Sequence, residues 1–197
     1  RRLVEFGASM DVEVEFRKAE VALGDERLSP EMVGVEEGEV VVVNFMLELS
    51  NVLEGGAVAR VLSLAASLRP KLVTLAELDA DLNTAPFQRR FVSALHFFSA
   101  MFDSLEASPM GRDSPHRLCM ERRLLGRRIV SMVGGPDPGP RRRLQSFADW
   151  HAAMSTAGFR PTSLGVYAAD QARILLLRFT FCQSFTLTEQ HHLGGAL

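Results

Sequence analysis

Two apolar runs separated by a long helical pattern constrain the fold of this 197-residue chain more than any other feature. The first run, residues 39–45, is continuous and β-branched, which is the pattern of a central strand covered on both faces. The second run, residues 72–75, predicts another strand. The stretch between them carries a helical apolar stripe made up of Val58, Val61, Leu62, Ala65 and Leu68. Because so long a connection is typical of a parallel crossover, we expect an open, mostly parallel α/β sheet flanked by helices.

The other predicted elements continue this alternation of strands and helices. An alternating segment at Val12–Phe16 predicts a strand with one exposed face, and Ser29-Pro30-Glu31 predicts the start of a short helix. A long helix is predicted from about Pro86, with an apolar stripe that we expect to be packed: Phe87, Phe91, Leu95, Phe98, Phe102 and Leu105. Further helices are expected over residues 115–132, 141–157 and 167–178, and a last strand over residues 185–189.

The net charge of −2 conceals a polarised chain. Residues 1–60 carry 13 acidic and 6 basic groups, whereas residues 106–150 carry 5 acidic groups and 9 arginines. The candidate contact residues in the basic part are Arg122, Arg123, Arg127, Arg128, Arg141, Arg142 and Arg143. These side chains could meet phosphates or acidic partner surfaces. A solvated helix face is the alternative, because aromatic residues do not interleave with the arginines as a stacking platform for single strands requires.

Polar side chains near the two predicted strands form a candidate ligand crevice, because open α/β sheets bind ligands beyond the carboxyl ends of their strands. These residues are Asn44, Glu77, Asp79 and Asn83. Paired carboxylates can divide acid and base roles, but the sequence places no His, Lys or Ser partner beside them. Helix capping and solvated turn charges are the alternative. Motifs for phosphate loops, dinucleotide binding, serine hydrolases and zinc proteases do not occur, so we expect no catalytic residue, cofactor or metal.

Three smaller signals concern the environment of the chain. No apolar stretch reaches the roughly 18–20 residues that cross a bilayer, so no membrane association is expected. Cys119 and Cys182 are too few for a disulfide framework, and we expect buried free thiols in a reducing compartment. Trp150 falls on the apolar side of its predicted helix and is expected in the core.

Three segments of the chain, in order, are EFGASMDVEVEF, GEVVVVNFMLELSNVLE and PKLVTLAELDADLN. They are similar to successive pieces of the core of the GRAS family of plant transcription regulators, in its SCARECROW-like branch, and nearly the whole chain shares this resemblance. Residues of about 70–133, with the helix FVSALHFFSAMFDSLE, resemble the PFYRE region. WHAAMSTAGF and QARILLLRFTFCQSFTLTEQ resemble the start of the SAW region, over about 141–197. Residues 1–197 are therefore expected to form a partial GRAS domain.

The resemblance implies a Rossmann-like core similar to the adenosylmethionine-dependent methyltransferase fold. The leucine-rich and VHIID segments of the family are expected upstream of Arg1, so we expect the sheet to be incomplete at its N-terminal side. An unpaired sheet edge is an aggregation hazard, and poorly cooperative unfolding is expected for these residues alone.

Two departures from the family pattern alter the polar chemistry of the middle of the chain. Phe97 and Phe98 stand where the family commonly has paired tyrosines, and Arg127-Arg128 stands where an Arg-Glu pair is usual. Either the arginine and glutamate contacts of the PFYRE motif run through Arg117 and Glu121 instead, or an intramolecular ion pair has been lost.

The function implied by the resemblance is non-enzymatic regulation of transcription in the nucleus, in development or stress signalling. The implied partners are other transcription factors, a second GRAS chain in a homodimer or heterodimer, and double-stranded DNA. One alternative is an adenosylmethionine-dependent small-molecule methyltransferase, with Asn44 and Glu77 at the mouth of the crevice. Another is a truncated product that folds only with a partner.

Overall fold

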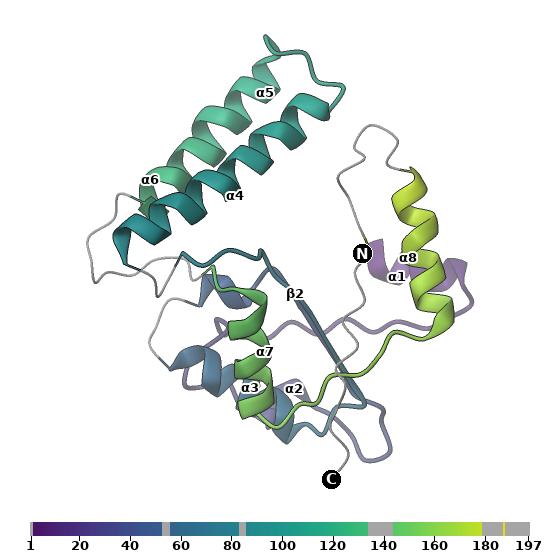
Figure 1. The fold of residues 1–197 in the computed structure, drawn as a ribbon. Coiled ribbons are helices and arrows are strands. Elements are labelled where there is room, and N and C mark those ends of the chain that lie inside the picture. Colours follow the sequence, from purple (N-terminus) through teal and green to yellow (C-terminus); the bar gives the residue numbers. More distant parts are fainter. Residues whose placement is uncertain (1, 53–55, 83–85, 134–143, 179–186, 188–197) are drawn as a thin grey trace.

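The computed structural model describes residues 2–52, 56–82, 86–133, 144–178 and 187 of the chain (Figure 1). Two parallel strands, β1 (Val42–Met46) and β2 (Leu72–Ala76), lie in register from Val42 opposite Leu72 to Met46 opposite Ala76. Helix α3 (Ala57–Ser67) connects them, which confirms the parallel crossover. The chain therefore has a mixed α/β fold of the Rossmann-like class, with helices around a small parallel sheet.

The first hydrophobic core joins the sheet to helices α3 and α7 (Phe147–Thr156). Its buried members are Phe45, Leu49, Val61, Leu62, Ala65 and Trp150. The three residues from α3 belong to the stripe that the sequence predicts, so the prediction of that helix face is confirmed. Trp150 is buried as expected, and it places α7 against the crossover helix.

The expectation that β1 is a central strand covered on both faces is wrong for the described residues. Among the described strands β1 pairs with β2 alone, and Val42 at its start is 58% exposed. The strand also begins three residues later than expected, because residues 36–39 close into a turn. In this turn the amide of Glu39 donates to the carbonyl of Glu36 at 3.2 Å, and Gly38 takes a φ of 93° that favours glycine.

The N-terminal part of the chain contains two short helices and lacks the expected strand at Val12–Phe16. Helix α1 (Arg2–Ser9) comes first and was not expected from the sequence. The side chains of Val12 and Phe16 are exposed. No described strand lies beside this segment to pair with its backbone, and a strand needs such a neighbour to be stable. Helix α2 (Pro30–Val33) begins after Ser29 as expected and ends at Gly34 in a left-handed conformation.

A helical hairpin extends away from the sheet and has its own core (Figure 1). Its first arm is α4 (Phe87–Ala107). Its second arm is one continuous helix made of α5 (Pro115–Cys119), the π-helical segment η2 (Met120–Gly126) and α6 (Arg127–Val133). Both arms begin and end close to the expected positions. Their shared core contains Leu82, Ala94, Phe98, Met132 and Leu144.

The apolar stripe predicted for α4 is only partly packed, so the prediction is wrong for most of its length. The buried residues of α4 are Arg90, Ala94, Phe98 and Leu105. Phe87, Phe91, Leu95 and Phe102 are exposed, with Leu95 at 57%. The helix contacts α6 along one side, and in the described residues nothing covers the rest of the stripe.

The remaining described helices are η1 (Leu49–Asn51), a 3₁₀ turn after β1, and α8 (Val166–Arg178), which matches the expected helix over 167–178. Helix α7 begins at Phe147, six residues later than expected. The strand expected over 185–189 lies outside the described residues apart from Leu187. None of the helices in the described part of the chain is both long enough and apolar enough to cross a membrane.

Two leucine-to-alanine substitutions test which predicted stripe is core. Leu62 is 1% exposed in the first core, so Leu62→Ala should lower the free energy of unfolding by about 2–5 kcal/mol. Leu95→Ala, on the uncovered stripe of α4, should change the free energy of unfolding by less than about 0.5 kcal/mol. Urea titration followed by circular dichroism measures both values. Equal losses for the two variants would contradict the packing described here.

Candidate interaction surface

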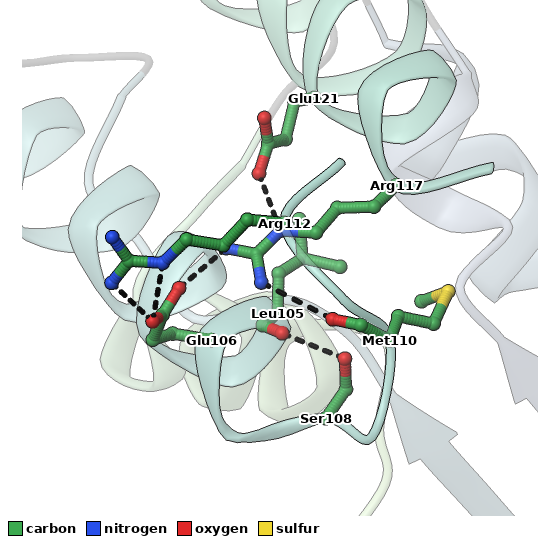
Figure 2. Close-up of polar contacts among 7 residues, drawn as sticks. All are labelled: Leu105, Glu106, Ser108, Met110, Arg112, Arg117 and Glu121. Carbon is green, nitrogen blue, oxygen red and sulfur yellow. Dashed lines mark hydrogen bonds and ion pairs between the residues drawn. The ribbon is translucent and has the colours of Figure 1, made fainter. Parts of the chain in front are cut away.

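A buried arginine braces the hairpin between its two arms (Figure 2). The side chain of Arg117 in α5 is 8% exposed, and its Nη2 lies 2.6 Å from Oε2 of Glu106, near the end of α4. Its Nε lies 2.8 Å from Oε1 of Glu121 in η2. Its Nη1 donates to the carbonyl of Met110 at 3.4 Å, and Glu106 also accepts from Nε of Arg112 at 2.9 Å. The arginine therefore joins α4, the loop and η2.

Local sequence explains why these groups meet. Ser114 and Pro115 begin α5, with the proline in the first turn, where its missing N–H costs nothing. Arg117 and Glu121 are four residues apart and so lie on the same side of the helix. At the end of α4 the hydroxyl of Ser108 donates to the carbonyl of Leu105 at 2.6 Å, which closes the last turn beside Glu106.

The electrostatics of this cluster favour its charged form. Hydrogen bonds from Arg112 and then Arg117 lower the pKa of Glu106 below its ordinary value of 4.5. Hydrogen bonds to Glu121 and then Glu106 raise the pKa of Arg117. A guanidinium removed from water is stable only when carboxylates or carbonyls replace its hydration, and this one has both.

Four further arginines follow Arg117 along the second arm of the hairpin and have different surroundings. Arg122, Arg123 and Arg127 are exposed, and Arg128 is half-buried. None of the four side chains makes a hydrogen bond or ion pair within the described chain. We call the surface formed by these four residues the arginine face. The other predicted contact residues, Arg141, Arg142 and Arg143, lie outside the described residues.

An open hollow of about 340 Å³ lies at one end of the arginine face. It is lined by Pro115, Leu118, Cys119, Arg122 and Arg123. Apolar residues and two arginines thus line the same open hollow. Cys119 is a free, exposed thiol, so the expectation of burial is wrong for this cysteine, and Cys182 lies outside the described residues.

The residues of the predicted crevice hold the fold together through separate hydrogen bonds. Asn44 lies in the middle of β1 instead of at its end, and its Oδ1 accepts from the hydroxyl of Thr74 at 2.8 Å. Oε1 of Glu77 accepts from the amides of Leu49 at 2.8 Å and Ser50 at 3.3 Å. Oε2 of Glu77 is buried without a hydrogen-bond partner in the described chain. A shared crevice stays a prediction, and Asn83 lies outside the described residues.

Asp79 and a capping box fix the start of α7, a feature that the sequence predictions missed. Oδ1 of Asp79 accepts from the amide of Phe147 at 3.0 Å. The hydroxyl of Ser146 accepts from the amide of Asp149 at 3.2 Å, and Oδ2 of Asp149 accepts from the amide of Ser146. Asp149 is the third residue after Ser146, and this spacing is the signal from which the helix start could have been predicted.

Metal binding has no support in the described part of the chain. No group of three or more His, Cys, Asp or Glu side chains is placed there to hold a metal ion. The pair His191-His192 lies outside the described residues.

Comparisons with known proteins agree on one family. A model of the GRAS domain family matches residues 1–195. The chain belongs to the GRAS domain family. It is 42% identical over 159 residues, 79% of its length, to SCARECROW-LIKE protein 7 of Oryza sativa subsp. japonica. It is 38% identical to Protein SCARECROW 1 of Oryza sativa subsp. indica, over an alignment of 200 positions that covers the whole chain. It is also 35% identical over 191 residues, 95% of its length, to DELLA protein GAIP of Cucurbita maxima.

The structural comparison agrees with the sequence matches. The crystal structure of SCL7 from Oryza sativa superposes with a TM-score of 0.79 and 37% identity, over 90% of this chain and 49% of that one. The GRAS chain described here covers 27% of SCARECROW-LIKE protein 7, 28% of Protein SCARECROW 1 and 32% of DELLA protein GAIP.

The departures from the GRAS pattern are accommodated in the hairpin. Of the two alternatives drawn from the sequence, the structure contains the ion pair between Arg117 and Glu121. Phe97 and Phe98 meet edge to face, with ring centroids 5.2 Å apart. Phe98 lies in the hairpin core, where a phenol hydroxyl would need a partner.

Acid should weaken the arginine cluster through Glu106. Because the pKa of Glu106 is lower in the folded chain than its ordinary value of 4.5, its stabilising effect is complete above that value. The effect is lost as the pH falls through the lowered pKa. Glu106→Gln should therefore be less stable than the unsubstituted chain at pH 7, and the gap in stability should close as the pH falls below 4.5 and through the lowered pKa. Urea midpoints across this range measure the gap, and a gap independent of pH would contradict the ion pairing.

Removal of the Asp79 carboxylate should loosen α7. Asp79→Ala leaves the amide of Phe147 without its acceptor and should lower the free energy of unfolding by about 1 kcal/mol. Asp79→Asn keeps an acceptor oxygen and serves as the matched control. The fluorescence of Trp150, the single tryptophan, follows unfolding in urea. Equal urea midpoints for the alanine variant and the unsubstituted chain would show that Asp79 does not stabilise the start of α7.

Proposed function

We propose that this chain is part of a plant GRAS regulator of transcription that works in the nucleus through contacts with other proteins, without catalysis. The relatives named SCARECROW and DELLA support a regulator that acts in plant development. The observation that carries the proposal is the arginine face. Its cations have no partner in the described chain, and they stand on a hairpin that the buried Arg117 holds in shape.

Two regions of the GRAS domain are proposed within the chain. The PFYRE region covers about residues 70–133, from the start of β2 to the end of the hairpin. The start of the SAW region covers about residues 141–197 and includes α7 and α8. The start of β2 at Leu72 and the end of α6 at Val133 lie close to the bounds proposed for the PFYRE region, and they support that part of the division.

The proposed partners are other transcription factors, a second GRAS chain and double-stranded DNA. We propose the same contact residues for protein partners and for DNA. They are the four residues of the arginine face together with Arg141, Arg142 and Arg143. Arginine suits both classes of partner, because its guanidinium pairs with carboxylates and phosphates in the same two-pronged geometry.

The hydrogen bonds of the crevice residues support the non-enzymatic part of the proposal. Glu77 and Asp79 accept from backbone amides, and Asn44 accepts from Thr74. Carboxylates used in this way brace loops and helix starts. No observation in the described residues places a general base or a nucleophile beside them.

A promoter-tethering experiment tests the proposed function. The full chain, fused to a heterologous DNA-binding domain, should enter plant nuclei and change the expression of a reporter gene. Neutralisation of Arg122, Arg123, Arg127 and Arg128 by alanine should reduce that change several-fold, because partner recruitment is lost. Arg160→Ala, at an exposed arginine beyond α7, is the matched control.

Two outcomes would count against this proposal. Reporter expression that stays at its basal level with the tethered, nuclear chain would overturn the regulatory role. Binding heat on titration of the full-length protein with micromolar adenosylmethionine would overturn the non-enzymatic assignment. If DNA is contacted directly, affinity for a duplex should fall steeply with salt, and less steeply in the arginine-neutralised variant.

A further inference from the structure

The outer side of the hairpin's second arm carries exposed apolar groups among its cations. Cys119, Leu124 and Val130 are exposed beside the arginine face, with Val130 at 69%. The hollow adds Pro115 and Leu118 next to two arginines. A surface that serves phosphates alone has no need for these groups, whereas a protein partner can bury them.

The π-helical turn helps to gather the arginines on this side. Arg122 and Arg127 are five residues apart, as are Arg123 and Arg128. In an unbroken α-helix, residues five apart point in directions about 140° apart. In a π-helix the N–H of one residue bonds to the carbonyl five residues earlier, so residues at this spacing come closer together. Residues 120–126 are π-helical, and the two pairs are therefore drawn toward one surface.

The charge of the hairpin is unbalanced in a way that favours an acidic partner. Residues 86–133 contain eight arginines and four acidic residues. Two of those acidic residues, Glu106 and Glu121, are already paired with Arg112 and Arg117. The arginine face is left as concentrated, uncompensated positive charge beside apolar groups.

We propose that the arginine face and its hollow bind an acidic amphipathic helix of a partner protein. The carboxylates of that helix would pair with Arg122, Arg123 and Arg127, and one of its apolar side chains would enter the hollow against Leu118. This combination of an apolar anchor with flanking charges is the usual way in which a groove recognises a helix. The inference rests on the proposed function, because it names the class of partner that a regulator of this kind would recruit.

The described residues argue against two other occupants. A single strand of nucleic acid needs aromatic platforms, and the arginine face has none in the described chain. A second copy of the chain offers an acidic turn over residues 36–39, but this turn is too short to follow the length of the arm. Pairing of two different surfaces would also join copies head to tail, unless both surfaces belong to one self-complementary patch.

A peptide-binding measurement tests the inference. The probe is a fluorescein-labelled peptide of about 18 residues, with leucines at helical steps of three and four and glutamates elsewhere. The full chain should bind it, and the combined substitution Arg122→Glu and Arg123→Glu should weaken binding about tenfold or more. Arg160→Glu should leave binding unchanged. A lysine-for-glutamate peptide should bind the doubly substituted chain better than it binds the unsubstituted chain, which a mere folding defect could not produce.

Other outcomes would overturn the inference. A scrambled peptide of equal composition that binds as tightly would show that charge alone is recognised. Displacement of the peptide by a 20-base-pair duplex at stoichiometric amounts would assign the face to DNA. A dimer that becomes a monomer on substitution of Arg122 and Arg123 would assign it to a second copy. Failed peptide binding together with a positive tethering result would reject this partner while the regulatory function stands.

Discussion

The burial of one guanidinium between two carboxylates is the interaction on which the hairpin depends. Arg117 ties the end of α4 to the start of the second arm. Separation of the arms would break its ion pair with Glu106, which lies in α4. Ala94, Phe98 and Met132 pack in the core that the same two arms share. Arg117 pairs with the carboxylates of Glu106 and Glu121, and the side chains of the arginine face have no carboxylate partner in the described chain.

Periodicity predicted the elements well and their surroundings less well. The parallel pair β1 and β2 and the buried side of α3 could be predicted, because crossover length and helical spacing are local properties of the sequence. Which surfaces of β1 and α4 are covered could not be predicted. A run of apolar residues indicates a preference for burial, but it does not indicate which element packs against it. Phe91 and Leu95 of α4 follow the helical period and are nonetheless exposed.

The roles of individual polar residues were the hardest to predict. Asp79 caps a helix that begins 68 residues later, and Glu77 accepts from amides 27 and 28 residues earlier. Such contacts form only when the chain is folded. The sequence therefore reveals the carboxylate but not the backbone amide that donates to it. Arg117 and Glu121 were easier, because their separation of four residues suggests a pair within one helix. The positive charge of the second arm could also be predicted, because it follows directly from the number of arginines in the sequence.

The two hydrophobic cores have no described residue in common, and this separation shapes how the chain would respond to mechanical load. The sheet core ends at α7, and the hairpin core ends at Leu82 and Leu144. Between them, the amide of Leu82 donates to the carbonyl of Leu144 at 3.2 Å, and the amide of Phe147 donates to Asp79. Tension on the hairpin would therefore be borne first at this narrow crossing, and the two cores can open as separate cooperative units.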